Sequence, residues 1–267
     1  MSSEALWDGY VDSIWDSSSF EAWNSIRDLT LFRELDYFHL PESLSSLKFD
    51  SDDRLTLTLP NNLRNLTFGH RFNQHIHGIM FNAGLQNLTF GDRFNNPVEH
   101  VRWPETLRTL RFGISFNQPM EWVTLPNGLQ ILTFSGAFNR SLEHVTLPSG
   151  LLELTFDGGH FNQPLANVAL PSGLQVLNLT SIMYNRPMEH VKLPDSLRQL
   201  QFGIRFQRSL EKVILPRSLQ IIMHPNYIHK ERLAKVKANI SFDETYCWGG
   251  QIRARDFEAL MLRSVNS

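Results

Sequence analysis

One phrase recurs along most of this chain at a nearly fixed interval. Aligned on a proline, successive copies are separated by 22, 22, 23, 23 and 22 residues. The aligned positions are Pro104, Pro126, Pro148, Pro171, Pro194 and Pro216, preceded at equivalent places by Pro60 and Asn82. A period of this length indicates stacked structural repeats, in which each repeat buries its apolar face against its neighbours.

Residues 138–161 illustrate the repeat unit. Two segments, Leu142–Leu147 and Leu151–Phe156, carry apolar residues at their first, fourth and sixth positions. The Pro-Ser-Gly sequence between them is typical of a turn, because proline cannot donate to a strand ladder. No helical period recurs in the unit. The sequence therefore predicts a mainly β fold, a solenoid with two short parallel strands in each coil of 22–23 residues.

Aromatic residues recur at two positions of the unit. The first column contains Phe49, Phe68, Phe90, Phe112, Phe134, Phe156, Leu179 and Phe202. The second contains Phe72, Phe94, Phe116, Phe138, Phe161, Tyr184 and Phe206. Burial of each ring contributes about 2–3 kcal/mol, and offset stacking between rings adds to this. We expect both columns to form ladders in the core.

An amide column lies beside the second aromatic column. It contains Asn73, Asn95, Asn117, Asn139, Asn162, Asn185 and Gln207. Buried polar groups need hydrogen-bond partners, and an amide at a coil corner can bond the backbone of adjacent coils. We therefore interpret these residues as a buried structural ladder rather than as ligand contacts.

Four tetrapeptides give the repeat a specific resemblance. They are Phe94-Asn95-Asn96-Pro97, Phe116-Asn117-Gln118-Pro119, Phe161-Asn162-Gln163-Pro164 and Tyr184-Asn185-Arg186-Pro187. This pattern resembles the FNIP repeat, a 22-residue relative of leucine-rich repeats, over about residues 55–223, and the segment before each proline also resembles BspA-type leucine-rich repeats. Three copies depart from it, with His75, Ser141 and Ser209 in place of the last proline. The resemblance implies a leucine-rich-repeat-like β-solenoid that acts as a protein-interaction scaffold, sometimes joined to an F-box, and without a catalytic motif.

The sequence divides into three parts. Residues 55–223 form the repeat solenoid, residues 1–54 an N-terminal helical cap with a degenerate first coil, and residues 224–267 a C-terminal helical cap. An array of coils exposes its core at both ends and therefore needs caps. Leu6, Trp7, Tyr10, Val11, Ile14 and Trp15 fall on one face of a helix over residues 3–15, and a short helix would bring Phe20 and Trp23 to the core. At the other end, helices are expected over residues 229–238 and 253–263. The N-terminal segment does not match an F-box.

Composition limits the cellular setting. The chain has one cysteine, Cys247, which suits a reducing compartment and predicts an intracellular, cytoplasmic protein. It lacks an apolar run long enough to span a membrane, and we expect no signal peptide. Residues 1–53 carry twelve acidic and three basic side chains, whereas residues 195–267 carry seven acidic and twelve basic ones.

Known catalytic and cofactor motifs do not occur in the sequence. Serine nucleophile elbows, P-loops, dinucleotide-binding glycine motifs and paired CxxC motifs are all missing. His70, His75 and His77 are close enough in sequence to suggest zinc, but they have no cysteine or carboxylate at ligand spacing. A basic stripe with interleaved aromatics, which would favour nucleic acid, is missing too. We expect no catalytic, cofactor or metal site.

Charged and aromatic residues form two further columns in the first segment of each coil. The candidate partner-binding residues are Glu99, His100, Arg102, Glu121, Trp122, Thr124, Glu143, His144, Glu189, His190, Lys192, Glu211 and Lys212. Stacked glutamates repel one another at a coil spacing of about 4.8 Å, and neighbouring basic groups offset this. One interpretation is a solvated sheet face, and the other is a recognition surface centred on Trp122.

Three functional hypotheses remain open from the sequence. The favoured one is a non-enzymatic scaffold that binds another protein through an exposed sheet face. The second is a structural subunit that assembles end to end, because an acidic start and a basic finish attract head to tail. The third is a substrate adaptor for ubiquitination.

Overall fold

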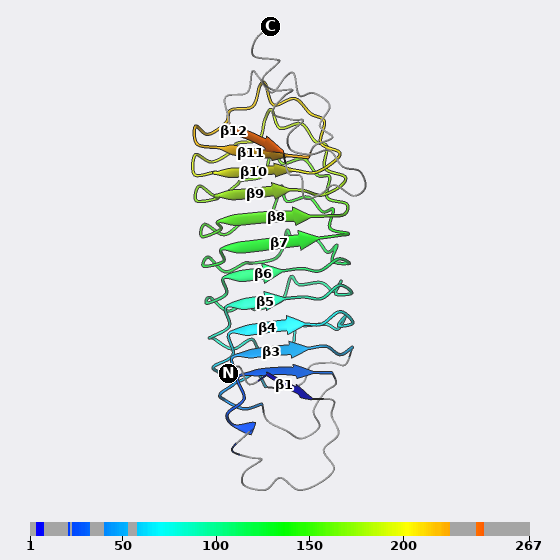
Figure 1. The fold of residues 1–267 in the computed structure, drawn as a ribbon, viewed down its shortest axis with the longest axis vertical. Coiled ribbons are helices and arrows are strands. Elements are labelled where there is room, and N and C mark those ends of the chain that lie inside the picture. The colour runs from blue at the N-terminus through cyan, green and yellow to red at the C-terminus, as the bar shows by residue number, and fades with distance from the viewer. Residues whose placement is uncertain are drawn as a thin grey trace, which may run out of the picture.

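The chain winds into an elongated stack of coils (Figure 1). A computed structural model describes residues 4–7, 21, 23–32, 40–52, 58–224 and 239–242. Within these residues, twelve short strands form one parallel sheet in which the strands follow chain order. The strands are β1 (Glu4–Trp7), β2 (Asp28–Leu31), β3 (Ser46–Phe49), β4 (Asn65–Phe68), β5 (Asn87–Thr89), β6 (Thr109–Arg111), β7 (Ile131–Ser135), β8 (Glu153–Asp157), β9 (Val176–Leu179), β10 (Gln199–Phe202), β11 (Gln220–Met223) and β12 (Asn239–Phe242). The predicted β-solenoid is confirmed.

The strand register places identical side chains directly over one another. Leu88 of β5 pairs with Leu66 of β4 and with Leu110 of β6, and all three are buried. Because side chains alternate along a strand, a slip of one residue would turn this whole leucine column to solvent. The leucine column therefore fixes the register of the stack.

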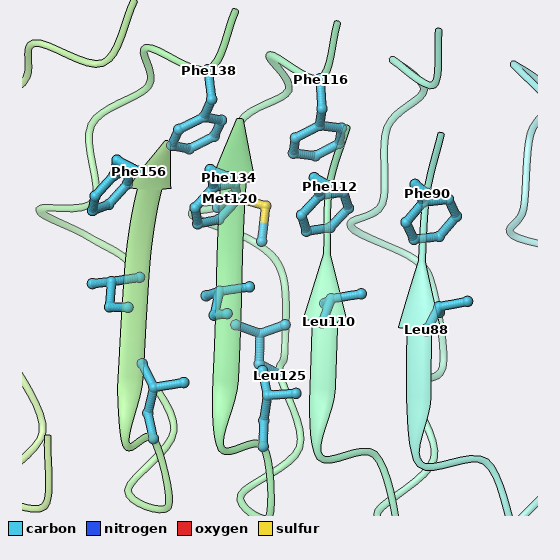
Figure 2. Close-up of a cluster of buried hydrophobic side chains, with 14 of the residues drawn as sticks. Leu88, Phe90, Leu110, Phe112, Phe116, Met120, Leu125, Phe134, Phe138 and Phe156 are labelled. Atoms are coloured by element: carbon cyan, nitrogen blue, oxygen red, sulfur yellow. The ribbon is translucent and has the colours of Figure 1, made fainter. Parts of the chain in front are cut away.

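The two aromatic columns are buried and stacked, as the sequence predicted. Phe112 lies 5.4 Å from Phe90 and 5.5 Å from Phe134 between ring centroids, with interplanar angles of 7°. The second column runs beside the first, and Phe134 lies 3.9 Å from Phe138. Figure 2 shows Phe90, Phe112, Phe134 and Phe156 in one row, with Phe116 and Phe138 in the row beyond. The core is thus a double ladder of rings along the solenoid axis.

Tyr184 continues the second column with a polar atom inside the core. Its ring lies 5.9 Å from Phe161, and its hydroxyl donates to the sulfur of Met188 at 3.2 Å. Burial raises the pKa of the Tyr184 phenol well above its ordinary value. The side chain therefore remains neutral in the folded protein.

The prediction of a second strand in each coil is wrong. Segment Leu142–Leu147 begins with a turn, in which the Val145 N–H donates to the Leu142 carbonyl at 3.0 Å. Glu143 and His144 are both exposed, whereas a strand would have turned one of them inward. The apolar positions are buried as expected, but they line the core from a turn and extended chain.

Each complete coil is one strand followed by three turns. One turn joins a glycine or serine to the second aromatic column, as in the bond from Phe116 N–H to the Gly113 carbonyl at 3.4 Å. The next closes at valine, and the last joins Pro126 to Leu129 at 3.0 Å. Each of these turns is closed by a hydrogen bond between residues three apart in sequence. The three turns bend the chain enough for 22 residues to form one full coil with only a single short strand.

The amide ladder exists, but the expectation that it is buried is wrong. Asn117 Oδ1 accepts the Asn139 N–H at 3.0 Å, and Asn139 Oδ1 accepts the Asn162 N–H at 2.9 Å. Asn73, Asn95 and Asn139 are exposed and the others are half-buried. The ladder lies at the surface because the chain turns after each ring of the second column and directs the amide side chain outward. There the amide oxygen accepts a backbone N–H of the next coil.

A second ladder runs beside the amides and was not predicted. From Asn96 onward, the residue after each ladder amide donates to the asparagine of the preceding coil. Gln118 Nε2 bonds the Asn95 carbonyl at 2.9 Å, and Arg140 Nε bonds the Asn117 carbonyl at 2.8 Å. The signal was present in the sequence, because this position carries asparagine, glutamine or arginine in every copy, and each of these side chains has an N–H donor.

Replacing Asn117 by alanine should lower the free energy of unfolding by about 1 kcal/mol. The change removes the oxygen that accepts the Asn139 N–H, and one exposed hydrogen bond contributes about that much. Urea denaturation followed by circular dichroism measures the difference. Asn117→Asp keeps the accepting oxygen and should stay close to wild type. An equal loss in both variants would show that the accepting oxygen is not what stabilises this corner.

The prediction of a helix over residues 3–15 is wrong for residues 4–7, the part of this range that the structure describes. Residues 4–7 form β1, which pairs with β2 in parallel from Glu4 beside Asp28 to Trp7 beside Leu31. A sheet edge leaves a row of unpaired backbone groups, and a strand can satisfy them where a helix cannot. Pairing at the end of the sheet outweighs the helical pattern of apolar residues.

Several other predictions concern the ends of the chain. Trp23 is buried, as expected, and so are Leu40, Leu44, Leu47 and Phe49 of the degenerate coil. Residues 8–20 and both predicted C-terminal helices lie outside the described residues. Strand β12 extends the sheet beyond residue 224.

Candidate interaction surfaces

The coils present two long surfaces with different chemistry. One is the outer side of the parallel sheet, which we call the sheet face. The other is formed by the exposed positions of the segment that contains the second turn, such as Glu121, Trp122 and Thr124. We call this the turn face. Because the candidate partner-binding residues occupy turns, the surface predicted to be a sheet face is in fact the turn face.

All thirteen predicted partner-binding residues are exposed on the turn face. Each coil brings its two turn-tip residues beside those of the adjacent coils, so the glutamates form a column as expected. Few contacts join the columns: Asn167 Nδ2 donates to Glu143 Oε1 at 2.8 Å, and His100 Nε2 lies 4.0 Å from Glu99 Oε1. This surface therefore presents a long row of exposed polar and charged side chains to solvent.

Trp122 is the most distinctive side chain of the turn face. It is 78% exposed, whereas Trp103 in the preceding coil is buried. Glu121 precedes it in the same turn. An exposed tryptophan among charged groups has the composition that binding hot spots share.

Ile214 is 87% exposed on the same face and was not among the predicted partner-binding residues. It occupies the position held by Arg102, Thr124 and Lys192 in other coils. The available signal was an apolar residue at a repeat position that is polar in most copies.

Two shallow hollows interrupt the turn face. The larger is about 800 Å³ and is lined by residues that include Ala166, Ala169, Glu189, Lys192 and Ile214. It forms where alanines replace the long side chains of neighbouring coils. A second hollow of about 360 Å³ lies around Glu99, His100, Arg102, Glu105 and Thr124.

On the sheet face, several polar side chains form hydrogen bonds with one another. Asn87 Nδ2 donates to Asn65 Oδ1 at 2.7 Å, and Arg111 donates to Thr133 Oγ1 at 3.0 Å. Thr133 and Thr155 are largely covered by their neighbours. Since these polar groups bond one another, they offer less to a partner than the groups of the turn face.

Neither a metal cluster nor a membrane-spanning helix is found in the part of the chain that the structure describes. His75 and His77 are neighbours, with ring centroids 5.7 Å apart, while His70 Nδ1 lies 2.6 Å from Asp92 Oδ2. The three histidines considered for zinc thus do not converge.

Comparison with known proteins identifies the repeat. The FNIP repeat pattern matches residues 116–157, 138–181 and 184–223, which contain part of the ring and amide ladders described above. Residues 116–181 and 184–223 of the solenoid are thus similar to FNIP repeats. Each coil in the matched range contributes one strand and an amide that caps the next coil, and most of these coils contribute two stacked rings, with Leu179 replacing one ring in a single coil.

A solved structure is also similar to this chain. It is described as CroV588, a novel circular LRR protein, and is 28% identical in sequence with a TM-score of 0.49. The similarity covers 82% of this chain and 40% of that one, so this chain spans less than half of that protein. No curated protein matches the chain.

Proposed function

We propose that this FNIP-repeat solenoid is a non-enzymatic scaffold that binds another protein through its turn face, with Trp122 at the centre of the contact. The observation that carries this proposal is the 78% exposure of Trp122 in a turn whose neighbours are charged. Leaving a large indole in water is unfavourable, and covering it with a partner would bury that apolar area.

The backbone around Trp122 supports a preorganised contact. The Val123 N–H donates to the Met120 carbonyl at 3.1 Å and closes the turn that presents the indole. Met120 and Val123 are both buried and attach this turn to the core. A side chain held on a rigid turn loses little conformational freedom on binding, which favours affinity.

Charge defines the kind of partner. Glu99, Glu121 and Glu143 lie on three successive coils beside Trp122, and all are exposed. Complementary charges steer association and set specificity, so we infer a partner surface that combines an apolar pocket with basic groups. Its association should slow as salt screens these charges.

Replacing Trp122 by alanine should weaken partner binding by about tenfold or more, because truncating a central aromatic anchor removes a large share of the binding energy. Glu121→Lys should weaken it too, by reversing the charge beside the anchor. Affinity capture with the wild-type chain identifies candidates, and titration of each purified candidate then measures Kd for every variant.

Leu152→Ala is the matched control. Leu152 is also an exposed apolar residue, 37% accessible, but it lies outside the turn face. It should bind the partner as wild type does. A partner that binds the Trp122 and Glu121 variants with unchanged Kd would exclude this face as its docking site.

A further inference from the structure

The rim of the sheet changes where two longer coils follow each other. In most coils three residues separate the two stacked rings, but four residues separate Phe156 from Phe161 and Leu179 from Tyr184. The next coil returns to three, between Phe202 and Phe206. Two long loops followed by a short one leave a step at the carboxyl ends of strands β8 to β11.

A pocket of about 420 Å³ occupies this step. Its lining consists of Asp157, Gly158, Thr180, Ile182, Gln201, Phe202, Gly203, Ile204, Ile222 and His224. Ile182 and Ile204 are 48% and 39% exposed, although they are large aliphatic side chains. The volume and the mainly apolar lining are those of pockets that bind small molecules.

Backbone geometry supports the shape of the pocket. A Cβ at Gly203 would lie 2.7 Å from the Thr180 carbonyl oxygen and 2.8 Å from that of Ser181, so two coil backbones pack directly against each other there. At Gly158 the same Cβ would meet no atom within 4 Å. One wall is thus closely packed backbone, and the mouth beside Gly158 is open.

The pocket has one acidic lining residue, Asp157 at the end of β8, and its other polar lining residues are Thr180, Gln201 and His224. Thr180 Oγ1 donates to Asp157 Oδ1 at 3.3 Å, and Asp157 is exposed at the mouth. Neither lysine nor arginine occurs among the lining residues. A ligand with an apolar body and a cationic end would match both the isoleucines and the carboxylate.

We propose that this rim pocket binds a small amphiphilic cation, with its apolar body against Ile182, Ile204 and Ile222 and its protonated amine beside Asp157. The pocket lies on the sheet side of the coil and shares no residue with the turn face. The proposal is therefore independent of partner binding through Trp122.

Isoleucine methyl NMR of the full chain tests the proposal directly. Phenylbutylamine is the probe, and phenylbutanol and phenylbutyrate are its neutral and anionic counterparts. The amine should shift the methyl signals of Ile182, Ile204 and Ile222 in a saturable way, with a Kd of about 1 mM or tighter for a ligand of this size. Ile114 occupies the same repeat position as Ile204 on a distant coil and is 55% exposed, so its methyl signal should not shift.

Two variants separate the charge from the apolar contact. Asp157→Asn should weaken the amine by about two- to fivefold, as expected for an exposed ion pair, and leave phenylbutanol unchanged. Ile204→Ala should weaken all three probes, whereas Ile114→Ala should weaken none. Absence of saturable shifts at the three pocket isoleucines would overturn the proposal, as would equal affinities for amine and carboxylate in the wild-type chain.

Discussion

Replacing Phe134 by alanine should cost about 3–5 kcal/mol of unfolding free energy, the usual range for deleting a buried phenyl ring. Phe134 is almost fully buried at the centre of the double ladder. Its ring stacks on Phe138 at 3.9 Å and lies 5.5 and 5.7 Å from Phe112 and Phe156. The neighbouring rings are held by their own coils and cannot close the cavity.

Phe134→Leu is the control, and urea denaturation measures both variants. Leu179 occupies the same column in another coil and is fully buried, so the repeat accepts leucine at this position. We expect Phe134→Leu to cost about 1.5 kcal/mol or less. If the alanine variant were no less stable than the leucine variant, the stacked rings would not be the main source of stability at this coil.

Gly159→Ala should destabilise the protein by about 3 kcal/mol or more, through two effects. Gly159 has a φ of +63°, which costs an L-residue about 1–2 kcal/mol. A Cβ there would also overlap the carbonyl group of Gly136 in the preceding coil, and overpacking adds about 1–3 kcal/mol. Relief of that overlap would break the bond from His160 N–H to the same carbonyl, which is 2.7 Å long.

The adjacent residue supplies the control for this prediction. Gly158 has nearly the same φ, +59°, but a Cβ there would meet no atom within 4 Å. Gly158→Ala should therefore show the conformational cost alone, about 1–2 kcal/mol. Thermal unfolding of both variants by circular dichroism gives the difference. Equal losses would mean that close contact between the coils contributes nothing at Gly159.

The core was predictable from sequence because stacked coils repeat one pattern many times. Columns such as Phe112, Phe134 and Phe156 recur at the same place in each period, and the structure stacks them as expected. The burial of these columns does not depend on whether the rest of each coil consists of strands or of turns. This is why the ladders were identified correctly although the strand content of the coil was not.

The second strand was predicted wrongly because apolar spacing alone does not distinguish a strand from a turn. Leu142, Val145 and Leu147 have the same spacing as Leu151, Leu154 and Phe156. The two segments differ in the structure at their middle positions, where Glu143 and His144 form the exposed tip of a turn, whereas strand β8 begins at Glu153. Two outward side chains in succession are compatible with a turn and not with a pleated strand.

The candidate surfaces were predictable only in part. Exposure of Trp122 and of the glutamate column followed from the repeat, since positions that vary in charge rarely face a core. The rim pocket could not be predicted, although the longer loops were visible in sequence. Its lining combines residues from four coils, and their approach depends on how loops of unequal length stack.

Among the residues that the structure describes, hydrogen bonds between coils join each coil to the one before it and the one after it. The Asn95 oxygen, for example, accepts from Asn117, and the Asn117 oxygen accepts from Asn139. Because the contacts between adjacent coils repeat, whole units of 22 residues can be gained or lost during evolution, and the remaining coils form the same contacts with their new neighbours. The chain can therefore change its length, and the distance between the sites it carries, without redesigning its interior.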